Sequence, residues 1–178
     1  MFISKNFSFF FVCMLAVCGN SISQTENISQ NQQIEESKLA LRMRKTDCWK
    51  FCPVYELTIQ PNGKVLFEGI RNTETKGKAE SFLSKDKIIE FIDEIEKADF
   101  FALKNSYTNV SDNCPGYRTD QPTVTVYIKM KGKEKTIIHN LGCKEIGGSE
   151  KVFPQQLYIL ENKIDEIVET KRWIGERK

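Results

Sequence analysis

The chain has 178 residues, of which 26 are basic and 24 acidic, and its formal net charge is +2 at pH 7. A charge this close to zero provides no electrostatic attraction for nucleic acid or for an anionic membrane. We therefore predict no nucleic-acid binding, and we expect the partner to be a protein or a small ligand.

Residues 1–23 have the layout of a secretory signal peptide. One basic residue, Lys5, precedes an apolar run of 12 residues from Phe7 to Cys18, and the segment holds no acidic residue. Because a membrane-spanning helix needs about 20 apolar residues, this run is too short to remain in a bilayer. We therefore predict cleavage before Gln24 and an exported chain that is periplasmic, tethered to the outer membrane, or extracellular.

The same leader contains a second processing signal. Residues 15–18, Leu-Ala-Val-Cys, resemble a bacterial lipoprotein box, in which Cys18 carries a lipid. Val17 is bulkier than the small residue usual before such a cysteine. The sequence leaves both alternatives open, and a lipid on Cys18 is the one membrane contact that it predicts.

Behind the leader, the chain divides into two parts. Residues 24–37 are rich in Gln, Asn and Ser, with two isolated isoleucines, a composition typical of a disordered leader. Residues 38–178 are predicted to form one domain. A domain of roughly this length buries about two thirds of its surface on folding.

The first half of this domain alternates between apolar and polar residues, as strands do. Residues 38–45 predict one strand. Residues 55–59 and 65–69 predict a hairpin, because Pro-Asn-Gly at 61–63 supplies the turn between them. A further edge strand is predicted near residues 76–82.

Apolar residues then recur at helical spacing in two segments, one before and one after a second hairpin. Ser84 is the predicted N-cap of a first helix, and Pro154 opens a last helix. Between them, residues 124–128 and 136–141 predict the hairpin, with its turn at 131–133. This order predicts an α+β fold: an antiparallel sheet of two hairpins plus flanking strands, with both helices packed on one face.

Four cysteines follow the leader, at positions 48, 52, 114 and 143. An even number in an oxidising compartment favours two disulfides, although three pairings are possible. One turn of chain brings residues four apart to about 6 Å, which suits a bond between Cys48 and Cys52. Cys114 and Cys143 flank the second hairpin, whose strand pairing brings them together.

Thiol–disulfide exchange by Cys48 and Cys52 is the alternative function. Redox enzymes usually place two residues between the cysteines and put the first at a helix N-terminus, where the thiol pKa is lowered. Here three residues intervene and Pro53 leads into a strand. A zinc site is disfavoured because Cys114 and Cys143 are too far apart in sequence, so we predict neither a metal nor a cofactor.

The remaining candidates are polar or aromatic residues near the cysteines. His139 is the single histidine, and it falls on the same face of its predicted strand as two apolar residues. We therefore predict that it is structural. A hydrolase would need His139 to meet Asp112, Tyr117 and Asp120 in one pocket. Trp49, inside the Cys48–Cys52 loop, is either a binding anchor or a side chain folded over the disulfide.

The string C-x-x-x-C-P-x-Y, formed by Cys48, Cys52, Pro53 and Tyr55, resembles the mark of a family of exported bacterial proteins, often lipoproteins, that is known only as a domain of unknown function. The resemblance extends from Leu39 to Ile174. Its weaker landmarks are Thr119, Asp120 and Trp173. Members usually place a glycine between the two cysteines, where this chain has Trp-Lys-Phe. The resemblance implies export, a bacterial origin and an α+β domain, and it implies no reaction.

We therefore predict a binding or interaction module and regard an enzyme as the less favoured class. Loops fixed by disulfides on a rigid sheet present side chains at a low cost in entropy. The predicted contact residues come from the loop between Cys48 and Cys52 and from residues 111–122. They are Trp49, Tyr55, Asp112, Tyr117, Arg118 and Asp120.

Overall fold

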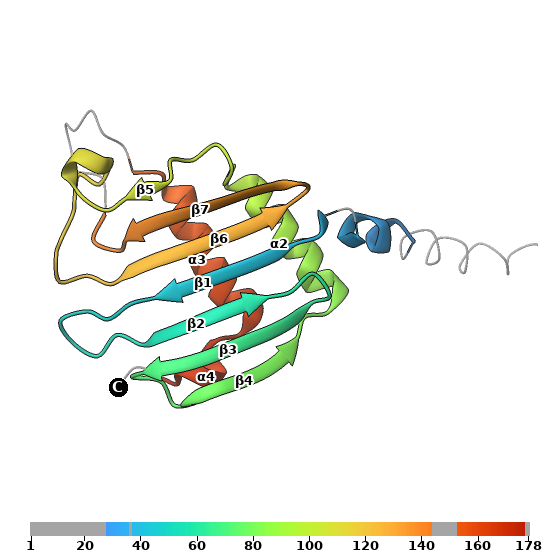
Figure 1. The fold of residues 1–178 in the computed structure, drawn as a ribbon, viewed down its shortest axis with the longest axis horizontal. Helices are drawn as coiled ribbons and strands as arrows, with labels where there is room; N and C mark the ends of the chain where they lie inside the picture. The colour runs from blue at the N-terminus through green and yellow to red at the C-terminus, as the bar shows by residue number, and fades with distance from the viewer. Residues whose placement is uncertain (1–27, 36, 144–152, 177–178) are drawn as a thin grey trace, which may run out of the picture.

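The computed structural model describes residues 28–35, 37–143 and 153–176 (Figure 1). The predicted signal peptide and the lipid on Cys18 lie outside these residues. Within the described ranges, the structure contains no helix that is both long and apolar enough to cross a bilayer.

The centre of the molecule is a seven-stranded sheet with the order β4-β3-β2-β1-β6-β7-β5. Its strands are β1 (Ala40–Lys45), β2 (Val54–Ile59), β3 (Lys64–Arg71), β4 (Gly77–Phe82), β5 (Ser106–Tyr107), β6 (Thr123–Met130) and β7 (Lys133–Asn140). All neighbours are antiparallel except β5, which pairs in parallel with β7. Both predicted hairpins are therefore present, as β2–β3 and β6–β7, and β1 joins them.

Helices α2 (Lys85–Lys97) and α3 (Gln155–Val168) lie together on one face of the sheet, as Figure 1 shows. A short helix, α4 (Lys171–Ile174), follows α3, and a 3-10 turn, η1 (Val110–Asp112), precedes β6. The predicted α+β class, with both main helices on the same face, is confirmed.

The hydrophobic core lies between the sheet and the helices, where the apolar face of the strands contacts the apolar stripe of each helix. Alternate residues of the central strands point to the helices and are buried, as Leu41, Leu57 and Val126 illustrate. Helix α2 begins at its predicted N-cap, because the Ser84 hydroxyl accepts a hydrogen bond from the Lys87 N–H. The buried stripe of α2 consists of Ile88, Phe91, Ile92 and Ile95.

Three features differ from the sequence-based expectation. Residues 28–35 are helical, in the stretch for which a disordered leader is predicted, and Ile34 packs partly against the core. Strand β1 begins two residues later than predicted, because Lys38 has a positive φ of 44° and breaks the extended backbone. The two-residue strand β5 and helix α4 are not predicted.

Candidate functional site

The connection between β1 and β2 is a closed corner, which we define as residues 46–53. A disulfide joins Cys48 to Cys52, with their Cα atoms 5.5 Å apart. The Trp49 N–H donates to the Asp120 carbonyl at 3.2 Å, and the Asn72 side chain donates to the Cys52 carbonyl at 3.0 Å. The disulfide therefore closes the corner, and the two hydrogen bonds attach it to the loop before β6 and to the connection after β3.

Two aromatic side chains project from this corner into solvent. Trp49 is 84% exposed and Phe51 is 87% exposed. At these exposures Trp49 is not folded over the disulfide, so the outward alternative is the one observed. Sequence reasoning missed Phe51, although its spacing of two from Trp49 inside the same loop was a usable signal.

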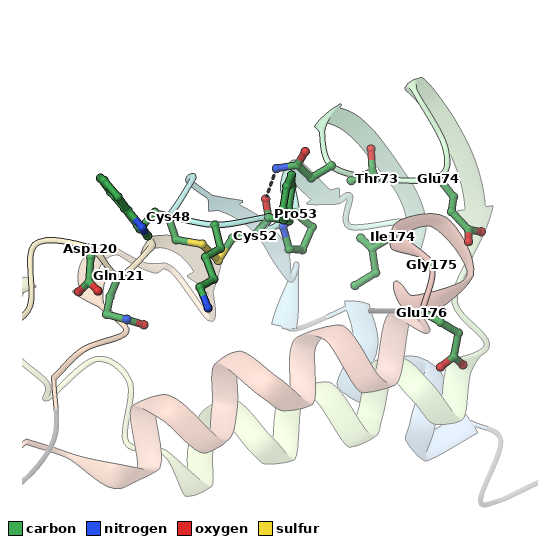
Figure 2. A pocket seen from close by; sticks show the side chains of 14 residues that line it. Cys48, Cys52, Pro53, Thr73, Glu74, Asp120, Gln121, Ile174, Gly175 and Glu176 are labelled. Atoms are coloured by element: carbon green, nitrogen blue, oxygen red, sulfur yellow. Dashed lines mark hydrogen bonds between the residues drawn. A yellow bond between two sulfur atoms is a disulfide. The ribbon is translucent and has the colours of Figure 1, made fainter. Parts of the chain in front are cut away.

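A groove of about 1000 Å³ separates the corner from two other segments, residues 72–74 and residues 174–176 (Figure 2). The far wall is held in place because the Thr75 N–H donates to the Trp173 carbonyl at 2.9 Å. Gly175 has a φ of 82°, and a Cβ there would lie 2.5 Å from the Glu74 side chain. Glycine therefore lets the chain after α4 pass close to the β3–β4 connection.

The structure brings only part of the predicted contact surface together. Trp49 and Asp120 both line the groove. Tyr55 does not, because it is only 1% exposed and its hydroxyl donates to Asp165 Oδ1 at 2.5 Å beneath the sheet. The prediction of Tyr55 as a contact residue is wrong. Its parity with Leu57 and Ile59 places it on the helix-covered face.

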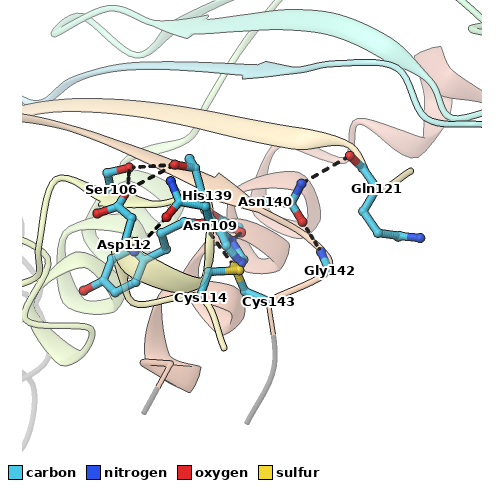
Figure 3. Close-up of a disulfide and its surroundings, with 12 residues drawn as sticks. Ser106, Asn109, Asp112, Cys114, Gln121, His139, Asn140, Gly142 and Cys143 are labelled. Atoms are coloured by element: carbon cyan, nitrogen blue, oxygen red, sulfur yellow. Dashed lines mark hydrogen bonds and ion pairs between the residues drawn. A yellow bond between two sulfur atoms is a disulfide. The ribbon is translucent and has the colours of Figure 1, made fainter. Parts of the chain in front are cut away.

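The second disulfide, between Cys114 and Cys143, lies in the protein interior (Figure 3). The predicted pairing is therefore the one that the structure contains. Nearby, the Asp112 carboxylate accepts hydrogen bonds from the hydroxyls of Ser106 and Thr108. The Ser106 bond is the main reason why the pKa of Asp112 lies below its ordinary value.

These contacts give Asp112 a structural role in holding the loop before β6. Tyr117 and Arg118 lie further along this loop, and both are exposed. Neither lines the groove beside the corner. The predicted contact residues of the 111–122 loop therefore separate, and Asp120 is the one that reaches the groove.

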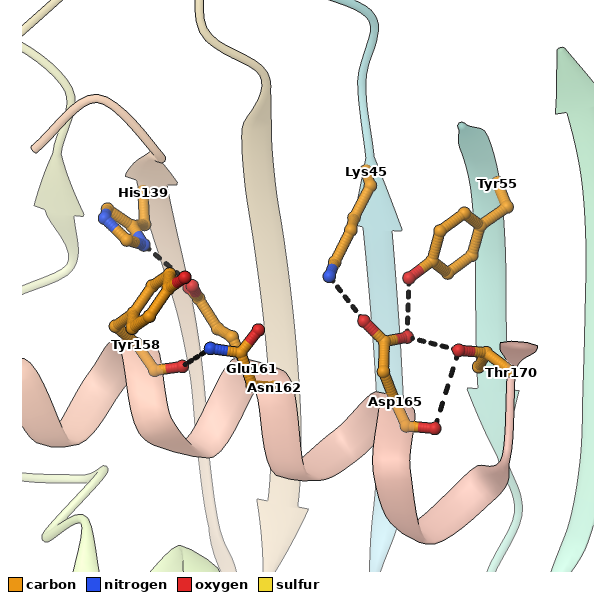
Figure 4. Close-up of polar contacts among 8 residues, drawn as sticks. All are labelled: Lys45, Tyr55, His139, Tyr158, Glu161, Asn162, Asp165 and Thr170. Carbon is orange, nitrogen blue, oxygen red and sulfur yellow. Dashed lines mark hydrogen bonds and ion pairs between the residues drawn. The ribbon is translucent and has the colours of Figure 1, made fainter. Parts of the chain in front are cut away.

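His139 is fully buried between the sheet and α3 (Figure 4). Its Nδ1 lies 2.8 Å from Oε2 of Glu161, and its ring stacks on Phe153 with centroids 4.5 Å apart. His139 Nε2 and Glu161 Oε1 have no hydrogen-bond partner among the described residues. Burial raises the pKa of Glu161, and the hydrogen bond with His139 opposes that rise.

This arrangement does not support the hydrolase alternative. His139 is paired with Glu161 in the interior, Asp112 is bonded to two hydroxyls, and Asp120 borders an exposed groove. A general base must reach a substrate proton within hydrogen-bond distance, directly or through one water molecule. Asp120 lines the groove beside the corner, whereas neither His139 nor Asp112 lines this groove.

A second polar cluster lies one helical turn further along α3 (Figure 4). The Asp165 carboxylate accepts hydrogen bonds from the Lys45 ammonium at 2.5 Å, the Tyr55 hydroxyl at 2.5 Å and the Thr170 hydroxyl at 2.9 Å. Glu161 and Asp165 are four residues apart, so both face the sheet. Sequence reasoning missed this pair, and the signal was two acidic residues on the apolar side of a helix.

The corner presents exposed aromatic rings and a closed disulfide. All four of the described cysteines are disulfide-bonded, so none presents a thiolate. Among the residues that the structure describes, no group of three His, Cys, Asp or Glu side chains is placed to hold a metal ion. The groove instead offers exposed aromatic rings, carboxylates and one lysine.

Comparison with known proteins gives one result that bears on identity. No curated protein matches the chain. A family description matches residues 39–168, which include all of the described strands and the whole of α3. The chain belongs to the DUF6438 family, a domain of unknown function.

Proposed function

We propose that this chain is an exported or envelope-tethered bacterial domain that acts by binding, and that the Cys48–Cys52 corner is its contact surface. The observation that supports this proposal is the exposure of Trp49 and Phe51 on a loop that is fixed at several points. Aromatic residues are enriched at the cores of protein interfaces, and tryptophan is among the residues that most often dominate the binding energy. Rings that are already held in position lose little entropy when they bind.

The cysteines and the leader support the proposed compartment. Two disulfides in the structure fit an oxidising environment. Residues 1–23 carry the features of a secretory signal, and Cys18 provides an alternative anchor through a lipid. The intact mass of the purified protein, measured with and without reductant, tests the cleavage site, the lipid and the number of disulfides together.

The binding role is tested by selecting ligands from a random-peptide library against the oxidised protein and measuring their affinities for two variants. W49A/F51A removes both projecting rings. Y158A/I159A is the matched control, because it removes two exposed apolar side chains from α3.

Truncation of a central aromatic anchor costs about 2 kcal/mol in binding, or about thirtyfold in Kd. We therefore expect W49A/F51A to lose at least this much affinity and Y158A/I159A to keep it. Ligands that bind both variants as tightly as the wild type would show that the contact surface lies elsewhere.

Thiol–disulfide exchange remains a second candidate, because Cys48 and Cys52 are half-buried, whereas Cys114 is inaccessible. The reduction potential decides between the two functions. Equilibration with glutathione buffers should give a potential below about −300 mV for a structural disulfide. A potential near those of exchange enzymes, above about −270 mV, would favour the redox function.

A further inference from the structure

The groove beside the corner carries a charge opposite in sign to that of the whole chain. Among the described residues that line it, Glu74, Asp120 and Glu176 carry carboxylates and Lys50 carries an ammonium. The chain as a whole has a net charge of +2. The described lining of the groove is therefore acidic while the chain as a whole is not, and an acidic lining favours a cationic ligand.

Two of the three carboxylates are available to a ligand. Glu176 pairs with Lys171 at 2.6 Å. Glu74 and Asp120 are exposed and have no ion-pair partner among the described residues. They come from opposite walls: the Asp120 carbonyl accepts a hydrogen bond from the Trp49 N–H, and Glu74 lies across the groove from Asp120 (Figure 2). A ligand with two separated positive charges matches this arrangement.

The surface between the two carboxylates is largely apolar. Phe51 and Pro53 contribute from the corner, and Ile174 contributes from the opposite wall. A volume of about 1000 Å³ accommodates several side chains of an extended peptide. The exposed faces of Trp49 and Phe51 also attract cations, because an aromatic ring carries negative charge on its face.

We propose that the groove binds a basic peptide segment, in which an apolar side chain contacts the groove surface and flanking Lys or Arg side chains approach Asp120 and Glu74. This inference rests on the proposed binding function and names the class of its partner. An anionic membrane is the competing partner for a loop with two projecting aromatic rings. The same carboxylates repel such a surface.

The proposal is tested by titrating the 15N-labelled, oxidised protein with two capped peptides, Lys-Gly-Leu-Gly-Lys and Glu-Gly-Leu-Gly-Glu. The reporter is the indole N–H resonance of Trp49, assigned with the W49F variant. Two substitution pairs are compared. E74Q/D120N removes the free carboxylates of the groove, and E90Q/D93N removes two exposed carboxylates of α2 as a matched control.

We expect saturable shifts with the basic peptide, an affinity about tenfold weaker in E74Q/D120N, and no change in E90Q/D93N. Binding should also weaken in 1 M salt, where the screening length falls to about 3 Å. Far-UV circular dichroism checks that all variants fold. The substituted side chains are exposed, so we expect no loss of structure.

Each contrary outcome has a separate meaning. Equal binding of the acidic peptide, or full affinity in E74Q/D120N, would overturn the proposed ligand class and leave the corner as a binding surface. Shifts of the Trp49 indole with vesicles of anionic phospholipid, and none with either peptide, would replace the peptide with a membrane. If neither peptide nor vesicle moves this resonance, both the inference and the proposed contact surface fail.

Discussion

Removal of the Cys114–Cys143 disulfide should destabilise the protein more than removal of the Cys48–Cys52 disulfide. The first bond joins residues 29 apart in sequence and the second joins residues 4 apart. A cross-link restricts the unfolded chain, and this restriction grows with the logarithm of the loop length. The corresponding stabilisation is about 3.6 kcal/mol for the longer loop and about 1.9 kcal/mol for the shorter one.

The burial of Cys114 and Cys143 also makes their disulfide the more stabilising of the two. Cys114 is 0% exposed and Cys143 is 7% exposed, so alanine at both positions also loses packing around the sulfurs. The cysteines of the corner are half-buried and lose less. We therefore expect C114A/C143A to unfold about 10 °C below the wild type, since each kcal/mol shifts the Tm of a domain of this size by roughly 2–4 °C.

The assays are thermal unfolding, which gives Tm, and urea unfolding of the wild type, C114A/C143A and C48A/C52A, both followed by far-UV circular dichroism. The slope of the transition should be compared as well as its midpoint, because removing a cross-link also expands the unfolded state. A loss of stability in C48A/C52A equal to or larger than that in C114A/C143A would refute this ranking.

Three further outcomes test the interior and the chemistry of the disulfides. Burial raises the pKa of Glu161 in the folded state. The free energy of unfolding should therefore fall as the pH rises from the unfolded pKa of about 4.3 to the raised folded pKa. Urea unfolding at several pH values should show this decline in the wild type and not in E161Q. D165A should lower the free energy of unfolding by about 2–3 kcal/mol, because it leaves the partly buried Lys45 unpaired. Y55F should lower it by about 1 kcal/mol, the net value of one neutral hydrogen bond. A change below about 0.5 kcal/mol in D165A would contradict this role. Under limiting reductant, mass spectrometry after alkylation should show opening of Cys48–Cys52 before the buried disulfide, and simultaneous opening would contradict the difference in accessibility.

The elements with strong local signals were predictable from the sequence. The hairpins combine period-two alternation with turn residues, and helix α2 has both an N-cap at Ser84 and an apolar stripe. Strand β5 has only two residues and exists because it pairs with β7. Its signal lies in tertiary contact, so local sequence does not reveal it. The same holds for Ile34, whose helical segment packs partly against the core.

The candidate site was only partly predictable, for a similar reason. The disulfide corner and Trp49 follow from cysteine spacing, whereas the opposite wall comes from residues 72–74 and 174–176, far away in the sequence. Tyr55 shows how a motif can mislead, because its place beside the cysteines suggested a contact while its strand parity indicated burial. The partner of His139 was unpredictable because it lies on α3, 22 residues away.

The two disulfides differ in what they contribute, and this difference bears on function. The long, buried bond accounts for most of the stabilisation expected from cross-linking, whereas the short, accessible one fixes the backbone that carries Trp49 and Phe51. If the corner binds through preorganised rings, opening it must add an ordering cost of about 1–2 kcal/mol for each freed residue to the binding reaction. We therefore expect C48A/C52A to remain folded at 25 °C and to bind peptides selected against the oxidised protein at least tenfold more weakly. Unchanged affinity in a folded C48A/C52A variant would show that rigidity of the corner contributes nothing to recognition.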